Sequence, residues 1–158
     1  MSKSFTNNSV QKLKDLLNEF EDFERDSVSE YKANNLANNS WHLIEWVKSD
    51  YIDVVEEMTL TDFRETLYPR CESLKIMHDI ANSSKHKSLD RPKATIRNAN
   101  LREGDFDPKD FNRNDFYVSS LEIVMEDGTI KPFLDEIQKV LLFWKEYFVN
   151  DLNEDINN

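Results

Sequence analysis

Glycine is nearly absent from this chain of 158 residues, which contains only Gly104 and Gly128. Phosphate-cradling loops and dinucleotide-binding fingerprints need several glycines at fixed spacing, because only glycine lets the backbone approach a phosphate so closely. Two glycines in the whole sequence cannot form either motif. Nucleotide enzymes of those classes are therefore excluded.

Cysteine is equally scarce, because Cys71 is the single thiol. One cysteine cannot form an internal disulfide, and it provides no Cys-x-x-Cys metal framework. No apolar run approaches the roughly 20 residues that a membrane span requires. The polar start of the sequence also lacks the apolar core of a signal peptide. These absences predict a cytoplasmic protein without a membrane partner.

Basic residues are outnumbered, with 20 Lys and Arg against 31 Asp and Glu, and the formal net charge is -11. Such a charge disfavours sequence-independent binding to nucleic acid or to an anionic membrane. It permits the opposite role, in which an acidic protein imitates nucleic acid and occupies a basic partner. Hydrophobic residues make up 39% of the chain, which is enough for the core of one domain.

The hydrophobic pattern predicts a mainly helical α+β domain. Apolar periodicity and capping residues indicate helices at 9–26, 27–50, 61–69, 70–87 and 133–150. Strand-like stretches follow at 93–102 and 116–125, and Asp127-Gly128 predicts a tight hairpin turn. The expected fold is a four- to five-helix bundle within a single domain, 1–150. A small antiparallel sheet is inserted before the last helix, at about 93–132, and the polar tail 151–158 is expected to fray.

The segment 71–92 contains the first group of candidate site residues. On a helical wheel Asp79, Asn82 and His86 fall in a sector of roughly 80°, opposite the apolar face. A histidine with a carboxylate and the cation Lys85 nearby has the residue types of general acid–base catalysis. The alternative is a solvated helix face whose last cations favour the helix dipole. The spacing alone leaves both interpretations open.

A second polar arc lies on the second predicted helix. Asn38, His42 and Glu45 share this arc, and Trp41 and Trp46 flank it. These residues are candidate binding residues if the two polar faces meet in the fold. The histidine and acidic side chains are also of metal-ligand type, but no His-Glu-x-x-His spacing occurs, and no metal or other cofactor is expected.

The stretch from about 35 to 92 resembles a known group of proteins. The residues concerned are Trp41-His42-Leu43-Ile44-Glu45-Trp46, then Cys71 with Leu74, then Asp79-Ile80-Ala81-Asn82-Ser83-Ser84-Lys85-His86. They look like small bacterial and phage proteins that have a Trp-rich helix and a Ser-Lys-His ending. More distantly they resemble HEPN domains, the four- or five-helix modules of prokaryotic toxin, CRISPR-linked and abortive-infection systems.

The resemblance implies specific site residues. Many HEPN proteins are dimeric, metal-independent RNases whose motif is an Arg, usually followed by a polar residue, and then a His near a helix end. His86 matches the motif His, and Asn82 matches its polar residue. The Arg has no counterpart, because Asp79, Ile80 and Ala81 occupy the available positions.

The missing Arg decides between the implied functions. An RNase would have to stabilise the charge on the reacting phosphate with Lys85, Arg91 or a residue of a second subunit. The resemblance therefore favours a protein-interaction or dimerisation module in a prokaryotic or phage defence or counter-defence system. Its partner would be another protein or a second copy of the chain. The alternatives are a metal-independent endoribonuclease that uses His86 on RNA, and an acidic mimic of nucleic acid.

Overall fold

The computed structural model describes residues 5, 8–55, 57–85, 93–94, 96–103 and 119–157, with the side chains at 84 and 85 excepted. The elements in chain order are α1 (Ser9–Glu24), α2 (Glu30–Asp50), α3 (Ile52–Val55), α4 (Leu60–Leu67), α5 (Ser73–Lys85), β1 (Ile96–Arg102), β2 (Ser120–Met125), β3 (Ile130–Pro132) and α6 (Phe133–Asn150). The predicted class is confirmed: the fold is α+β and mainly helical, with a small antiparallel sheet before the last helix.

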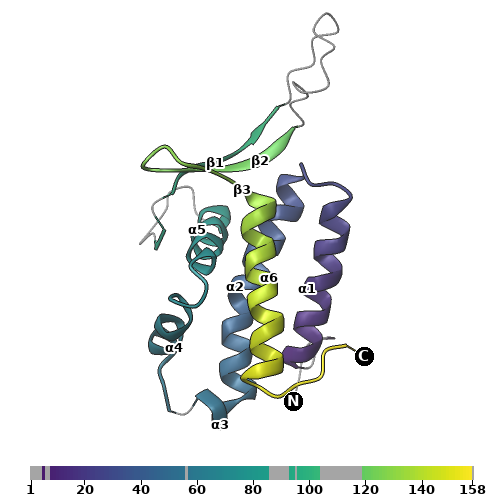
Figure 1. Ribbon diagram of the computed structural model, residues 1–158, viewed down its shortest axis with the longest axis vertical. Coiled ribbons are helices and arrows are strands. Elements are labelled where there is room, and N and C mark those ends of the chain that lie inside the picture. The colour runs from purple at the N-terminus through teal and green to yellow at the C-terminus, as the bar shows by residue number, and fades with distance from the viewer. Residues whose placement is uncertain are drawn as a thin grey trace, which may run out of the picture.

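The helices form a bundle that the sheet covers at one end. Helices α1, α2 and α6 run along the long axis of the molecule, α5 and α4 flank them, and the sheet crosses the end opposite α3 (Figure 1). Among the described residues, no helix combines the length and the apolar character that a membrane crossing needs. Helices α5 and α6 lie beside each other under the sheet (Figure 1).

Side-chain caps decide where the helices begin. The side chain of Asn8 accepts a hydrogen bond from the backbone amide of Gln11 at 2.8 Å. Ser29 caps α2 in the same way, and Thr59 caps α4. Because an N-cap residue lies just outside the helix, α2 begins at residue 30 and not at the predicted 27.

The core is built around α6 and one face of α2. The buried residues of α2 include all those that the sequence periodicity predicts, and Trp41 is buried in addition to them. The predicted set is Ala33, Leu36, Ala37, Ser40, Leu43, Ile44 and Val47. Trp144 of α6 is completely buried, and its indole Nε1–H donates a hydrogen bond to the backbone carbonyl of Ser40 at 3.0 Å. An indole is seldom buried without such a partner, so this bond fixes α6 against α2.

The sheet has the strand order β1-β2-β3, and both pairs are antiparallel. Leu121, Ile123 and Met125 alternate along β2 as its buried residues, so one face of the sheet packs on the helices. Gly128 adopts a φ of +89° in the turn between β2 and β3, a conformation that favours glycine. The predicted hairpin turn is thereby confirmed.

The polar tail docks on the bundle. Arg70 donates two hydrogen bonds to the carboxylate of Asp151, each 2.9 Å long. The hydroxyl of Tyr51 donates to Glu154 at 2.8 Å, and Leu152 is buried. The prediction of a fraying tail was therefore wrong for the described residues 151–157. That prediction considered only the polarity of the tail itself and left out its hydrogen-bond partners in the rest of the chain.

Candidate functional site

Helix α2 packs on α5 beside the predicted polar arc. The contact is made by Trp41, which flanks that arc, and by His78, which lies outside the predicted polar sector of α5. The ring of Trp41 contacts the ring of His78 edge to face, with 4.8 Å between the ring centroids and 70° between the planes. Trp41 is only 4% exposed, and the side chain of His78 is 16% exposed. The contact between the two helices thus runs through an aromatic side chain and a histidine.

Asp79 is buried and not solvated. Its carboxylate accepts hydrogen bonds from the backbone amides of Lys93 at 2.8 Å and Ala94 at 2.7 Å. The Nδ1 atom of His78 lies 2.7 Å from the same carboxylate, and because a carboxylate only accepts, this nitrogen carries the shared proton. Of the two interpretations that the helical wheel left open, the solvated helix face does not hold for Asp79, because the returning segment 93–94 covers this side of α5. Three donors offset much of the cost of burying the charge.

The other residues predicted for catalysis are only partly within the described structure. Asn82 lies on α5 and is half-buried. Lys85 is the last residue of α5, but its side chain falls outside the described part, as do His86 and Arg91. Of the four predicted catalytic side chains, the structure therefore places Asp79 and Asn82, one turn apart on the same helix.

Two of the predicted binding residues of α2 belong to a row of polar side-chain contacts beside Trp41. The Nδ1 atom of His42 lies 3.4 Å from a carboxylate oxygen of Glu45. Arg64 of α4 donates from Nη2 to that same oxygen at 3.2 Å. The Arg64 guanidinium also lies over the ring of Trp41, at 4.9 Å from the centroid. Sequence reasoning missed Arg64, although it supplies a cation next to the predicted aromatic residue.

The remaining two α2 residues have different surroundings. Trp46 packs toward α1, where the Nζ atom of Lys12 lies 5.3 Å from its ring centroid. Trp46 is thus separate from the contact between α2 and α5. The Oδ1 atom of Asn38 is buried and has no hydrogen-bond partner in the described part of the chain.

Tyr68 is a second residue that sequence reasoning missed. Its ring stacks on Trp41, with 6.0 Å between centroids and 4° between planes. It is 3% exposed, and its hydroxyl has no hydrogen-bond partner among the described residues. Burial raises the pKa of this phenol far above its ordinary value of 10, so the hydroxyl stays protonated. The only signal in the sequence was the four-residue spacing that puts Arg64 and Tyr68 on one face of a helix.

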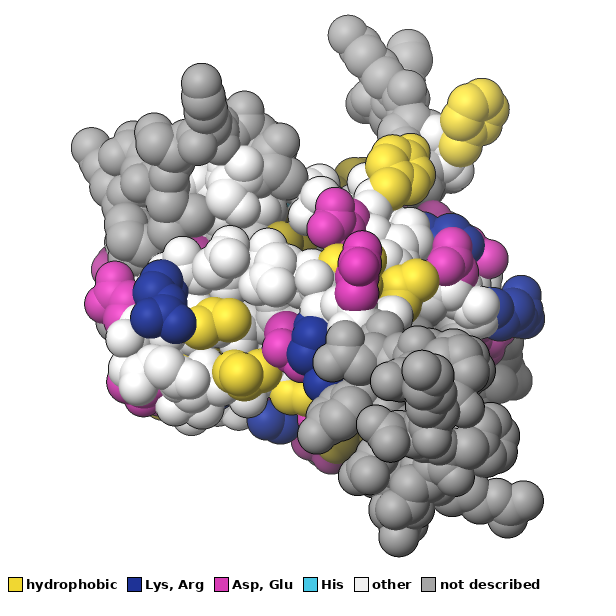
Figure 2. All heavy atoms as spheres, turned by 90° about the horizontal axis from the view of Figure 1, so that it is seen from above, with side chains coloured by type: hydrophobic (Ala, Val, Ile, Leu, Met, Phe, Trp, Pro, Cys, Tyr) yellow, Lys and Arg dark blue, Asp and Glu magenta, His cyan; other side chains and the backbone are white. Residues whose placement is uncertain are grey.

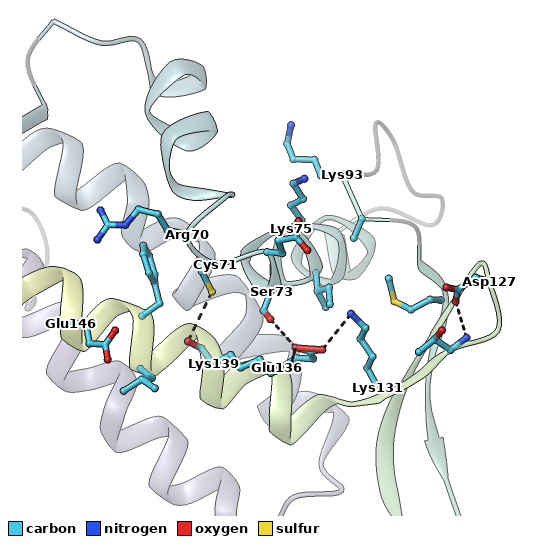
Figure 3. A pocket seen from close by; sticks show the side chains of 17 residues that line it. Arg70, Cys71, Ser73, Lys75, Lys93, Asp127, Lys131, Glu136, Lys139 and Glu146 are labelled. Atoms are coloured by element: carbon cyan, nitrogen blue, oxygen red, sulfur yellow. Dashed lines mark hydrogen bonds and ion pairs between the residues drawn. The ribbon is translucent and has the colours of Figure 1, made fainter.

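A groove of about 720 Å³ lies between α5, α6 and the turn after β2 (Figure 3). At its base the carboxylate of Glu136, 2% exposed, accepts a hydrogen bond from the Ser73 hydroxyl at 2.7 Å. Lys139 and Lys131 lie 3.3 Å and 3.7 Å from the same carboxylate. These contacts join α5, α6 and the hairpin, and they fix the shape of the groove.

The groove wall combines buried apolar side chains with charges of both signs. Cys71 is 8% exposed, and burial raises the pKa of its thiol, which makes it a packing residue and not a nucleophile. Leu142, by contrast, is 57% exposed beside the buried Phe143. The lining also contains four carboxylates and five cations, namely Arg70, Lys75, Lys93, Lys131 and Lys139.

Two findings bear on the identity of this site. Within the described ranges, no group of three or more His, Cys, Asp or Glu side chains is arranged to hold a metal ion. No family model, curated protein sequence or solved structure matches this chain significantly. A functional interpretation therefore rests on the groove and on the cluster around Trp41 and Tyr68.

Proposed function

We propose that this chain is a protein-interaction module that forms a homodimer through the groove between α5 and α6. The supporting observation is Leu142, which is 57% exposed at the edge of the groove. Contact of the groove with another protein surface would remove this exposed leucine from water together with the apolar part of the groove lining. At the end of the molecule that Figure 2 shows, apolar side chains of the described residues are likewise interspersed with acidic and basic ones.

The charge distribution favours a second copy as the partner. Two chains that each carry a formal charge of -11 repel one another, so they associate best where the local charge is nearly balanced. The groove lining, with five cations and four carboxylates, is such a place. Arg70 and Glu146 lie at the same end of the groove in Figure 3. A two-fold axis would place charges of both signs opposite one another, while Arg70 keeps Asp151 as its partner within the chain.

The proposed setting is a bacterial or phage defence or counter-defence system. This part of the proposal is supported by the sequence resemblance to HEPN domains, many of which are dimeric. The groove geometry supports only the interaction itself, and it is compatible with any system in which a paired helical module is needed.

Leu142→Glu tests the proposal, because it places a charge at the exposed apolar edge. Sedimentation velocity or light scattering should give the wild-type protein twice the chain mass of 18.7 kDa and the variant the mass of one chain. Val149→Glu is the matched control, since Val149 is 42% exposed on the same helix and does not line the groove. A wild-type protein that is monomeric at all concentrations, or equal effects of both variants, contradicts the proposal.

The two alternative functions predict other results. An endoribonuclease would cleave RNA as a pure protein, and His86→Ala would abolish the cleavage while leaving the fold intact. That result would show that the chain is an enzyme and would contradict its interpretation as an interaction module. A mimic of nucleic acid would form a stoichiometric complex with a basic nucleic-acid-binding protein, and added salt would dissociate it.

A further inference from the structure

We propose that Arg64, Tyr68, Lys75 and Lys93 form a binding site for the phosphate group of a small phosphomonoester. The site lies where α4, α5 and the segment 93–94 meet, around the ring of Tyr68. Lys75 and Lys93 also line the groove, whereas Arg64 and Tyr68 do not, and the proposed dimer contact depends on Leu142.

Two buried hydrogen-bond donors at this place have no acceptor within the described structure. They are the hydroxyl of Tyr68 and the Nε–H of Arg64. Glu45 accepts from the Nη2 atom of Arg64 and leaves the Nε–H unused. Arg64 lies in α4, and Tyr68 is the C-cap residue of that helix, one turn later, so that the charge of Arg64 acts on the Tyr68 phenol. Unpaired buried donors are rare in folded proteins and call for a ligand or water as acceptor.

Two ammonium groups add positive charge at the same ring. The Nζ atoms of Lys75 and Lys93 lie 5.5 Å and 5.9 Å from the centroid of Tyr68. In the groove, Lys131 and Lys139 have Glu136 as a partner, whereas Lys75 and Lys93 have an aromatic ring. Figure 3 shows that both side chains extend in the same direction, away from Glu136. Neighbouring cations repel unless an anion lies between them.

The number of donors and the net charge of the chain indicate the class of ligand. A guanidinium, two ammonium groups and a protonated phenol supply more donors than one carboxylate can accept, and they suit a phosphate with three terminal oxygens. A net charge of -11 repels a polyanion over long range, so a small molecule is favoured over nucleic acid.

Calorimetric titration of the whole chain with phenyl phosphate and with inorganic phosphate tests this site. Both probes should bind saturably at one site per chain. Lys93→Gln and Tyr68→Phe should each weaken binding about tenfold, the factor expected for one charge-assisted contact. Both variants should fold, since Lys93 is exposed and the Tyr68 hydroxyl has no partner among the described residues. Lys145→Gln removes the same charge from an exposed position of α6 and should leave the affinity unchanged.

Three results would overturn the assignment. The first is the absence of saturable binding, and the second is an equal loss with Lys145→Gln, which would mean that only the overall charge matters. The third is single-stranded RNA that binds more tightly than phenyl phosphate and is weakened by the same variants, because the site would then belong to nucleic acid. Leu142→Glu should keep the wild-type phosphate affinity, so a failure of the dimer and a failure of this site can be told apart.

Discussion

The backbone amide of Lys93 donates a hydrogen bond to the carboxylate of Asp79 across 2.8 Å. Fourteen residues separate the two along the chain, so this bond ties the approach to the sheet onto α5. The amide of Ala94 and the ring of His78 complete the surroundings of the same carboxylate. One acidic side chain therefore holds Lys93, and with it part of the proposed phosphate site, in position.

Asp79→Asn should lower the free energy of unfolding by about 2–4 kcal/mol, because an amide cannot accept from three donors and loses the charge that strengthens each bond. Urea unfolding followed by circular dichroism measures the change. Asp135→Asn is the matched control, since Asp135 is exposed in the first turn of α6, and it should change stability by about 0.5 kcal/mol or less. Similar losses in the two variants would show that the carboxylate of Asp79 has no special structural role.

Cys71 should react slowly with a thiol reagent in the folded protein. Its side chain is buried, and burial raises the pKa of the thiol, so the reactive thiolate is scarce at pH 8. The reaction should be at least about tenfold faster in unfolding concentrations of urea. Absorbance of the released chromophore measures both rates. Equal rates with and without urea would mean that the thiol is accessible in the native state.

The docked tail should make stability depend on pH in the acid range. Hydrogen bonds from Arg70 hold the pKa of Asp151 below its ordinary value of 3.8. As the pH falls below 3.8, the carboxylate of Asp151 binds a proton in the unfolded chain while it is still ionised in the folded chain. The contribution of Asp151 is therefore complete above that pH and is lost as the pH falls through the lowered pKa.

Asp151→Asn should remove this loss and flatten the fall in stability below about pH 4. The effect should be about 0.5 kcal/mol or less, because both partners are substantially exposed and solvent screens the pair. Urea unfolding at pH 7 and at pH 3 measures it. Arg70→Gln should flatten the same region, since it removes the donor that lowers the pKa. An unchanged acid slope in Asp151→Asn would show that the pair does not form in solution.

Local patterns in the sequence predicted the parts of the fold that depend on local rules. The buried face of α2 follows from helical periodicity, and the hairpin follows from Asp127-Gly128. Asp79 could not be predicted in the same way, because the groups that bury it come from residues 93 and 94. The docking of Asp151 depends on Arg70, 81 residues earlier. Such contacts are set by tertiary packing, which a helical wheel does not contain.

The candidate site also contains residues that local patterns predict and residues that only tertiary packing brings together. Sequence reasoning identified the polar arc beside Trp41 and required that it meet the sector of Asp79, Asn82 and His86. In the structure Trp41 contacts His78 of α5, whereas Glu45 of the arc pairs with Arg64 of α4. It did not identify Arg64 or Tyr68, because α4 is short and its boundaries are weakly marked. The feature that distinguishes Tyr68 is a buried hydroxyl without a hydrogen-bond partner among the described residues. That feature exists only in the folded protein. His86, on which the RNase interpretation depends, lies outside the described residues.

The bond from Trp144 to Ser40 has a consequence for biosynthesis. The two residues are 104 positions apart, so a ribosome that adds about 5–20 residues per second delivers the indole roughly 5 to 20 seconds after its acceptor. During that interval the apolar face of α2 has no α6 to cover it. The nascent chain can therefore complete this part of its core only after α6 has emerged from the ribosome.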